Sequence, residues 1–360
     1  MKHKAMILLL VWGALTLAAW FSPEKALSVS ERRPLAGKPE LSAGAVFSGN
    51  FMEDFEDYSL DQFPFRDSFR RLKAWFHYSV LGQRDNNGIY VYQGYAAKQE
   101  YPLNETSVAH ALNRFQTLYE TYLTQSNVYM AVVPDKGYYL AEQSGHLAMD
   151  YDRLYELVEI GMPWAAQVDL RDSLSAGDYY RTDTHWRQEK LLDAAGVLCQ
   201  ALGIAPPKVE DYTRTALDRP FYGVYYGQAA LPMEPDTLYL LESTLLENCT
   251  VYDYETGKTG SVYDRNKLES QDLYDVFLSG ARSLLTIENP DGDPDRELIV
   301  FRDSFGSSMV PLLVQGYGKV TLVDIRYIRM ELLGEYLDFA GKDVLLLYST
   351  LVLNNSAAIK

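Results

Sequence analysis

The segment ELIVFRDSFGSS, residues 297–308, joins a short apolar strand to a polar turn and the start of a helix. Two further apolar runs follow it, KVTLVDI (319–325) and DVLLLY (343–348), and segments with helical spacing, GSSMVPLLVQGYG and RMELLGEYLDFAG, separate the three. Apolar strands that alternate with helices are typical of βαβ units, whose parallel sheet is covered by helices on both faces. The segment therefore predicts an α/β fold with a mostly parallel sheet in three α/β/α layers.

The same alternation begins earlier in the chain, with a predicted helix over residues 108–123 and an apolar strand, NVYMAVVP, over residues 127–134. It fades between residues 208 and 290, where the sequence is acidic and rich in tyrosine. We therefore predict one domain over residues 86–360, with 208–290 as an insertion. The tyrosines between Tyr222 and Tyr263 either stack on sugar rings or fill a core.

The amino terminus indicates export from the cytoplasm. Basic residues at positions 2–4 precede an uncharged apolar run over residues 5–21, so residues 1–28 are predicted to be a signal peptide or an N-terminal membrane anchor. Both alternatives stay open, and either one places the rest of the chain outside the cytoplasmic membrane. Residues 29–85 are predicted to be a linker followed by an amphipathic helix, whose apolar positions are Phe69, Leu72, Trp75, Phe76 and Val80.

Charge and composition limit the classes of partner. The chain has 360 residues, 47% of them hydrophobic, so it can bury a full core. Its formal charge of -16 opposes binding to nucleic acid. The two cysteines, Cys199 and Cys249, either pair in an oxidising compartment or remain separate buried thiols.

Ser304 is the candidate nucleophile. In open parallel sheets ligands bind beyond the carboxyl ends of the strands, and Ser304 occupies a strand-to-helix turn at such an end. The amides of Ser304 and Phe305 at the helix start are candidate donors to an oxyanion. The alternative interpretation is that Asp303 and Ser304 only cap the helix.

A serine hydroxyl needs a base, and that base needs a group to orient it. His185 and Asp183 in RTDTHWRQEK (181–190) are the candidates, because His185 alone among the five histidines has an acid two residues away and an aromatic neighbour, Trp186. Trp186 is itself a candidate for contact with substrate. The alternative is a capped helix start, with Asp183 or Thr184 as the cap. No spacing of Cys, His, Asp and Glu indicates a metal site, and no glycine-rich phosphate loop follows a strand. We therefore expect no cofactor.

These segments resemble a known family. YRTDTHWRQEK and FRDSFGSSMVPLL are similar to motifs of the alginate O-acetyltransferase group (AlgX/AlgJ-like) and the related DHHW proteins, which have an SGNH-hydrolase-like domain. ERRPLAGKPEL, DQFPFRDSF and VVPDKGYYL occur in the family's order, so the resemblance covers most of residues 30–355.

The resemblance implies a serine-dependent O-acyltransferase. Ser304 would carry the acyl group, His185 would act as base and then acid, and Asp183 would orient His185. The family acts outside the membrane, beside a membrane-bound O-acyltransferase (MBOAT) that supplies acetyl groups, and modifies polysaccharide hydroxyls. A polysaccharide acetyl esterase and a non-catalytic polysaccharide-binding or assembly protein are the alternatives.

Other positions depart from the family pattern or match it loosely. Thr184 takes the second place of the DHHW signature, as in the alginate type. Arg302 stands where a hydrolase has glycine, and either restricts the backbone near Ser304 or supplies charge to the oxyanion. Asn354 and Asn355 are candidate oxyanion donors or merely end a strand. Lys136, in the family's PDK block, is a site candidate or half of a structural salt bridge.

Overall fold

The computed structural model describes residues 2–28 and 30–360. These residues form two compact units. The N-terminal unit contains the chain up to Asn87 together with residues 226–233, and the sheet unit contains residues 88–225 and 234–360. A short stretch of the predicted insertion thus packs with the N-terminal unit.

The N-terminal unit is mainly helical. Its first helix, α1, has a 19-residue stretch with a mean hydropathy of 1.8, long and apolar enough to cross a membrane. A signal sequence has the same properties. The unit's elements are α1 (Lys2–Phe21), β1 (Leu27–Ser28), β2 (Arg33–Pro34), α2 (Ala43–Ser48), α3 (Asn50–Asp61), α4 (Arg66–Trp75) with a π-helical continuation (Phe76–Val80), and most of α9 (Val224–Ala229).

The sheet unit is built on eight strands of the described chain, in the order β10-β9-β11-β13-β12-β14-β5-β6. The strands from β13 to β6 pair in parallel, whereas β11, β9 and β10 extend the β13 edge in antiparallel fashion. The predicted mostly parallel α/β sheet is therefore confirmed. Its strands are β5 (Asn127–Val133), β6 (Ala166–Asp169), β9 (Thr250–Asp253), β10 (Lys258–Gly260), β11 (Leu284–Glu288), β12 (Glu297–Arg302), β13 (Lys319–Val323) and β14 (Asp343–Ser349).

The predicted insertion over residues 208–290 is partly a continuation of this sheet, because it supplies β9, β10 and β11. Its remaining part forms a separate two-stranded sheet of β7 (Thr213–Ala216) and β8 (Tyr239–Glu242) and the helix α10 (Thr244–Asn248). A third pair, β3 (Ile89–Tyr92) with β4 (Tyr95–Lys98), lies near the start of the unit.

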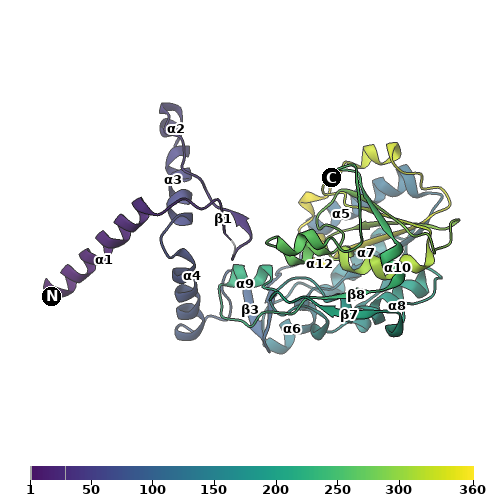
Figure 1. Ribbon diagram of the computed structural model, residues 1–360, viewed down its shortest axis with the longest axis horizontal. Coiled ribbons are helices and arrows are strands. Elements are labelled where there is room, and N and C mark those ends of the chain that lie inside the picture. The colour runs from purple at the N-terminus through teal and green to yellow at the C-terminus, as the bar shows by residue number, and fades with distance from the viewer. Residues whose placement is uncertain (1, 29) are drawn as a thin grey trace. The chain divides into compact units, whose positions relative to one another are not determined.

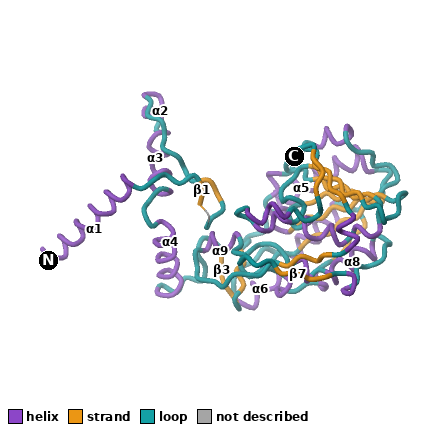
Figure 2. The backbone as a smooth tube through the Cα atoms, in the orientation of Figure 1, coloured by secondary structure: helices purple, strands orange, loops and turns teal. Residues whose placement is uncertain are grey.

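Helices cover both faces of the sheet (Figures 1 and 2). Alternate residues of β14 enter different cores: Leu345 and Leu347 pack in the core that contains α8 (Leu192–Ala201). Val344 and Leu346 pack in the core that contains α5 (Glu105–Leu118) and α7 (Tyr151–Gly161). Because every residue of β14 is buried, its run of apolar side chains is explained, and the three-layer architecture is confirmed.

The crossovers are less helical than predicted. The helix after β12 has only four residues, α11 (Gly306–Met309), before the chain tightens into 3₁₀ turns at Pro311, which lacks an amide donor. The segment predicted as a helix after β13 is a 3₁₀ turn over Met330–Glu335. No helix starts directly at His185: Trp186 forms an antiparallel bridge with Tyr179, a 3₁₀ turn covers Gln188–Lys190, and α8 begins only at Leu192.

The two cysteines are free thiols, and both are buried in the same core as α8. Burial raises the pKa of Cys199 to about 12 and that of Cys249 to about 11, which makes both thiols poor nucleophiles. Of the two alternatives for this pair, the structure has separate buried thiols.

Candidate active site

The site lies where three neighbouring parallel strands end. β5 is followed by Asp135, β12 by Asp303 and Ser304, and β14 ends at Ser349, which is followed by Thr350. The Ser349 amide donates to Asp303 Oδ2 at 2.8 Å, and the Thr350 hydroxyl donates to Asp135 Oδ2 at 2.7 Å. These hydrogen bonds connect the three loops, so the loops after β5 and β14 help to fix the turn that carries Ser304.

Asp183, His185 and Ser304 meet at this edge. The Ser304 hydroxyl lies 2.8 Å from His185 Nε2, and His185 Nδ1 lies 2.6 Å from Asp183 Oδ1. Asp183 is buried, the His185 side chain is 11% exposed, and Ser304 is half-buried. With a proton on Nδ1 donated to the carboxylate, Nε2 is free to accept the serine proton. The arrangement can therefore activate a hydroxyl nucleophile.

The Asp183 carboxylate is oriented from two sides. The His185 amide donates to Oδ1 at 3.0 Å, and the Val224 amide donates to Oδ2 at 2.8 Å. Gly223 packs so closely that a β-carbon there would lie 2.2 Å from the Asp183 β-carbon. The backbone of the tyrosine-rich segment is thus part of the site, which the sequence did not reveal.

Gly223→Ala is expected to destabilise the fold and to displace Asp183, because the new methyl group would overlap Asp183 main-chain and side-chain atoms. Overpacking of this kind typically costs about 1–3 kcal/mol. Thermal unfolding measures the loss. The control is Gly260→Ala, because a β-carbon at Gly260 would meet no atom within 4 Å and Gly260 does not have a positive φ. Equal melting temperatures for Gly223→Ala and Gly260→Ala would contradict the expectation.

The His185 imidazole is clamped by aromatic rings. Tyr274 stacks on it with a centroid distance of 3.9 Å and an interplanar angle of 8°, and Phe305 lies 5.1 Å away in a tilted orientation. The Tyr274 hydroxyl is hydrogen-bonded to the Ser308 hydroxyl at 2.8 Å. Tyr274 belongs to the 208–290 segment and was not singled out from the sequence. It fixes the plane of the ring that must move a proton.

Lys136 is buried, with 2% of its surface exposed. Its ammonium donates to the main-chain carbonyls of Asp183 at 2.6 Å and Tyr180 at 2.8 Å. Burial lowers the pKa of Lys136 from its usual 10.5 to about 7. Its hydrogen-bond acceptors are carbonyls rather than a carboxylate, so Lys136 holds in place the loop that carries the Asp183–His185 pair.

The turn after β12 offers one free amide rather than the predicted two. The Phe305 amide donates to Asp303 Oδ1 at 3.0 Å and is therefore occupied. Within residues 2–28 and 30–360, no acceptor is assigned to the Ser304 amide. Of the two predicted oxyanion donors, only the Ser304 amide remains available in this conformation.

Arg302 and Trp186 support the turn from inside. Arg302 is 1% exposed, and its guanidinium donates to Ser307 Oγ at 3.1 Å and to the Gly280 carbonyl at 3.3 Å. Trp186 is fully buried, and its indole donates to the Phe305 carbonyl at 3.0 Å. Of the two alternatives for Arg302, these contacts favour restriction of the backbone near Ser304. The expected contact of Trp186 with substrate is not supported, because its side chain is fully buried.

Asn354 and Asn355 are committed elsewhere. They lie at the end of α12 (Thr350–Asn354), and both side-chain amides donate to Glu100 Oε2 at 3.2 Å. The Asn354 carbonyl oxygen also accepts from the Asn104 amide at 2.7 Å. They therefore tie the chain end to the segment before α5, and the predicted oxyanion role is not supported by their contacts.

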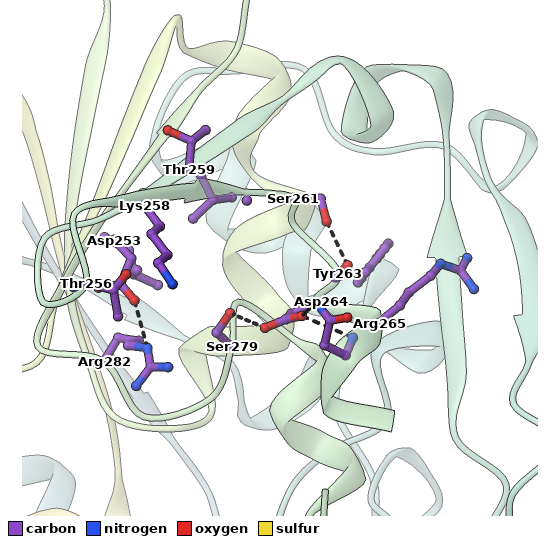
Figure 3. Close-up of a pocket in the computed structure, with 14 residues that line it drawn as sticks. Asp253, Thr256, Lys258, Thr259, Ser261, Tyr263, Asp264, Arg265, Ser279 and Arg282 are labelled. Atoms are coloured by element: carbon purple, nitrogen blue, oxygen red, sulfur yellow. Dashed lines mark hydrogen bonds and ion pairs between the residues drawn. The ribbon is translucent and has the colours of Figure 1, made fainter. Parts of the chain in front are cut away.

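A cavity of about 450 Å³ lies on the antiparallel side of the sheet unit (Figure 3). Hydroxyl groups and charges of both signs line it, and the Arg282 guanidinium lies 3.0 Å from Asp253. Its wall includes Tyr263, whose hydroxyl donates to Gln188 Oε1 at 2.9 Å, three residues from His185. The labelled lining residues are Asp253, Thr256, Lys258, Thr259, Ser261, Tyr263, Asp264, Arg265, Ser279 and Arg282.

Residues 168–323 match the model of the family described as DHHW protein, so the predicted resemblance to that family is confirmed over this range. The matched range contains Asp183, His185 and Ser304. No match is found among curated proteins.

Two solved structures share the fold with TM-scores above 0.5, and a third matches at a lower score. A DHHW family protein from Eubacterium siraeum is 21% identical, with 76% of this chain and 95% of that chain covered and a TM-score of 0.62. Bacillus cereus PatB1 with a sulfonyl adduct is 16% identical, with coverage of 74% and 95% and a TM-score of 0.58. The O-acetyltransferase domain of Pseudomonas putida AlgJ is 14% identical, with coverage of 74% and 92% and a TM-score of 0.46.

Proposed function

We propose, from the premise that residues 168–323 match the DHHW family, that this protein is an extracytoplasmic O-acyltransferase that moves acetyl groups onto polysaccharide hydroxyls. The observation that carries the proposal is the continuous hydrogen-bond chain from Asp183 through His185 to Ser304. The apolar helix α1 supports the location, since it is long enough for an anchor or a signal sequence.

The first half of the reaction loads the enzyme. Ser304 Oγ attacks the carbonyl carbon of the acetyl donor while its proton passes to His185 Nε2. The bond between the acetyl carbon and the donor's leaving oxygen breaks, and His185 returns the proton to that oxygen. The product is acetyl-Ser304. Asp183 stabilises the imidazolium that exists between the two proton transfers.

The second half transfers the group. A sugar hydroxyl gives its proton to His185 Nε2 and attacks the acetyl carbon, after which Ser304 Oγ leaves and recovers that proton. In both halves negative charge develops on the acetyl oxygen, and the unoccupied Ser304 amide is the candidate donor to it. The two half-reactions regenerate the enzyme, and the atoms and protons they need come from the acetyl donor, the sugar hydroxyl, Ser304 and His185.

Donor and acceptor are part of the proposal. The donor is a membrane-bound O-acyltransferase (MBOAT), which would deliver acetyl groups to the side of the membrane on which the sheet unit lies. The acceptor is a polysaccharide. The cavity of Figure 3 is lined by hydroxyls and charges of both signs, but Asp183, His185 and Ser304 are not among its lining residues. The family match, and not this cavity, therefore supports the polysaccharide acceptor.

Trapping of the acyl-enzyme tests the proposal. Incubation with an activated acetyl ester, followed by rapid acid quenching and peptide mass analysis, is expected to place one acetyl group on the peptide that contains Ser304. A sulfonyl fluoride, which an activated serine hydroxyl also attacks, is expected to modify the same peptide. Labelling of other serines with none at Ser304 would overturn the assignment.

The fate of the acetyl group separates transfer from hydrolysis. With an oligosaccharide present, a transferase is expected to produce acetylated sugar in preference to free acetate, because an acceptor held near the acyl carbon excludes water. Free acetate at the same rate with and without oligosaccharide would instead identify an esterase.

A further inference from the structure

The helix α4 is amphipathic, but its apolar side chains are exposed and its charged side chains pack against the unit that contains it. Starting at Phe65, the apolar side chains recur every three or four residues and so share one side of the helix and its π-helical continuation. Phe65 is 71% exposed, Leu72 57% and Val80 53%. We call this side the outer face of α4; it comprises Phe65, Phe69, Leu72, Trp75, Phe76 and Val80.

The opposite side of α4 is polar and packed. Arg66 pairs with Glu31 and lies 3.4 Å from Asp61, and Arg70 lies 3.2 Å from Glu31. Arg70 also donates to the Gly227 carbonyl at 2.8 Å. The guanidinium groups are thus satisfied inside the unit. Because these contacts fix the rotation of the helix, the outer face of α4 cannot turn inward without breaking them.

Six large apolar side chains on one exposed side form a patch that a monomer in water rarely keeps. We propose that the outer face of α4 rests in the surface of a lipid bilayer, with the helix lying in the membrane plane. It is a second membrane contact, in addition to the one that α1 provides when it is retained.

The dimensions and residue types fit that occupant. The 16 positions from Phe65 to Val80 extend over about 24 Å at 1.5 Å per residue, too short to span a bilayer but suited to lying along it. All but Val80 are Trp, Phe or Leu, the residue types found on the apolar face of helices that lie in the membrane interface. Lys73 flanks the face and is exposed, so its charged end can reach the headgroups.

The position in the chain favours a bilayer over another protein. α1 ends at Phe21, and its composition allows it to cross a membrane, so a retained α1 tethers residues 65–80 close to the lipid surface. The overall charge of -16 argues that apolar burial, rather than attraction to anionic lipid, supplies the affinity. Neutral phosphatidylcholine vesicles should therefore suffice.

The test uses the full chain reconstituted into phosphatidylcholine vesicles, with one environment-sensitive dye on an introduced cysteine. The native thiols, Cys199 and Cys249, are buried and react poorly. Dyes at Leu72→Cys and Phe76→Cys are expected to be quenched by lipids brominated on the acyl chain and protected from aqueous iodide.

The matched control is Asp67→Cys, because the Asp67 side chain is 54% exposed and lies on the same helix away from the outer face. Its dye is expected to respond to iodide and not to brominated lipid. Iodide quenching of all three dyes would overturn the proposal, and so would protection of Leu72→Cys and Phe76→Cys from both quenchers, which would mean that protein covers the face. The readout does not depend on acyl transfer.

Discussion

Ser304→Ala is expected to lower the rate of acetyl transfer by on the order of 10³-fold or more, because alanine has no hydroxyl oxygen that can attack the donor and form the acetyl-enzyme. The fold should tolerate the change, since the Ser304 hydroxyl is hydrogen-bonded to the His185 ring and the side chain is half-buried. Steady-state kinetics with a model acetyl ester and an oligosaccharide acceptor measure the effect. Thermal unfolding checks that the variant remains folded.

A matched substitution shows whether the loss belongs to Ser304. Ser173→Ala removes a hydroxyl that donates to the Leu170 carbonyl in a surface 3₁₀ turn, so its rate should equal that of the unchanged protein. Wild-type turnover by Ser304→Ala would refute the nucleophile assignment and leave the non-catalytic polysaccharide-binding alternative as the better account.

The Asp183 variant tests whether the three residues act as one unit. Asp183→Asn keeps the shape of the side chain but favours the tautomer with the proton on Nε2, so it should reduce the rate by roughly 10³–10⁴-fold. Added to Ser304→Ala, it should cost almost nothing more, because a unit that has lost its nucleophile has no proton to move. Multiplication of the two losses would show that Asp183 acts independently of Ser304.

The arrangement of strands could be predicted because it follows from local pattern. Three apolar runs, over residues 297–301, 319–325 and 343–348, are each long enough for a strand and too short for a buried helix. Burial of both sheet faces explains why they are apolar throughout. The crossovers were predicted to be more helical than they are. Apolar spacing in a short segment does not show that Pro311 lacks an amide donor, and it does not distinguish a 3₁₀ turn from an α-helix.

The site was predictable in part. Ser304 and His185 could be identified from their sequence neighbours. Ser304 follows a predicted strand end, and His185 has an acidic residue, Asp183, two positions before it. Tyr274 and Gly223 act only through contacts made across the fold, stacking on the imidazole and packing on Asp183, and no local spacing encodes such contacts.

Sequence neighbourhood also misled. Arg302 and Trp186 are adjacent to site residues in the chain, yet their side chains point into the interior. Along a strand, successive side chains take opposite faces, so adjacency to a site residue does not by itself imply a shared direction. Burial, which decides whether a cation or an indole can reach a substrate, depends on what the rest of the chain packs against it.

Lys136→Met is expected to lower the free energy of unfolding by about 2–4 kcal/mol, because the buried carbonyls of Asp183 and Tyr180 lose their donor. Methionine has a similar length, so the change tests the lost hydrogen bonds more than a lost volume. Urea unfolding measures it. Lys208→Met, at an exposed position, should stay within about 0.5 kcal/mol of the unchanged protein.

The pH dependence of this loss of stability shows whether it comes from the buried, titrating amine of Lys136 or only from lost packing. Since burial lowers the pKa of Lys136 from 10.5 to about 7, the unfolded chain binds one more proton than the folded chain between those values. Stability contributed at this position therefore rises with pH in that window, by up to about 1.4 kcal/mol per pH unit. The gap between the unchanged protein and Lys136→Met should widen from pH 7 to about pH 9. A constant gap would mean that the hydrogen bonds to the Asp183 and Tyr180 carbonyls keep the pKa of Lys136 near its ordinary value.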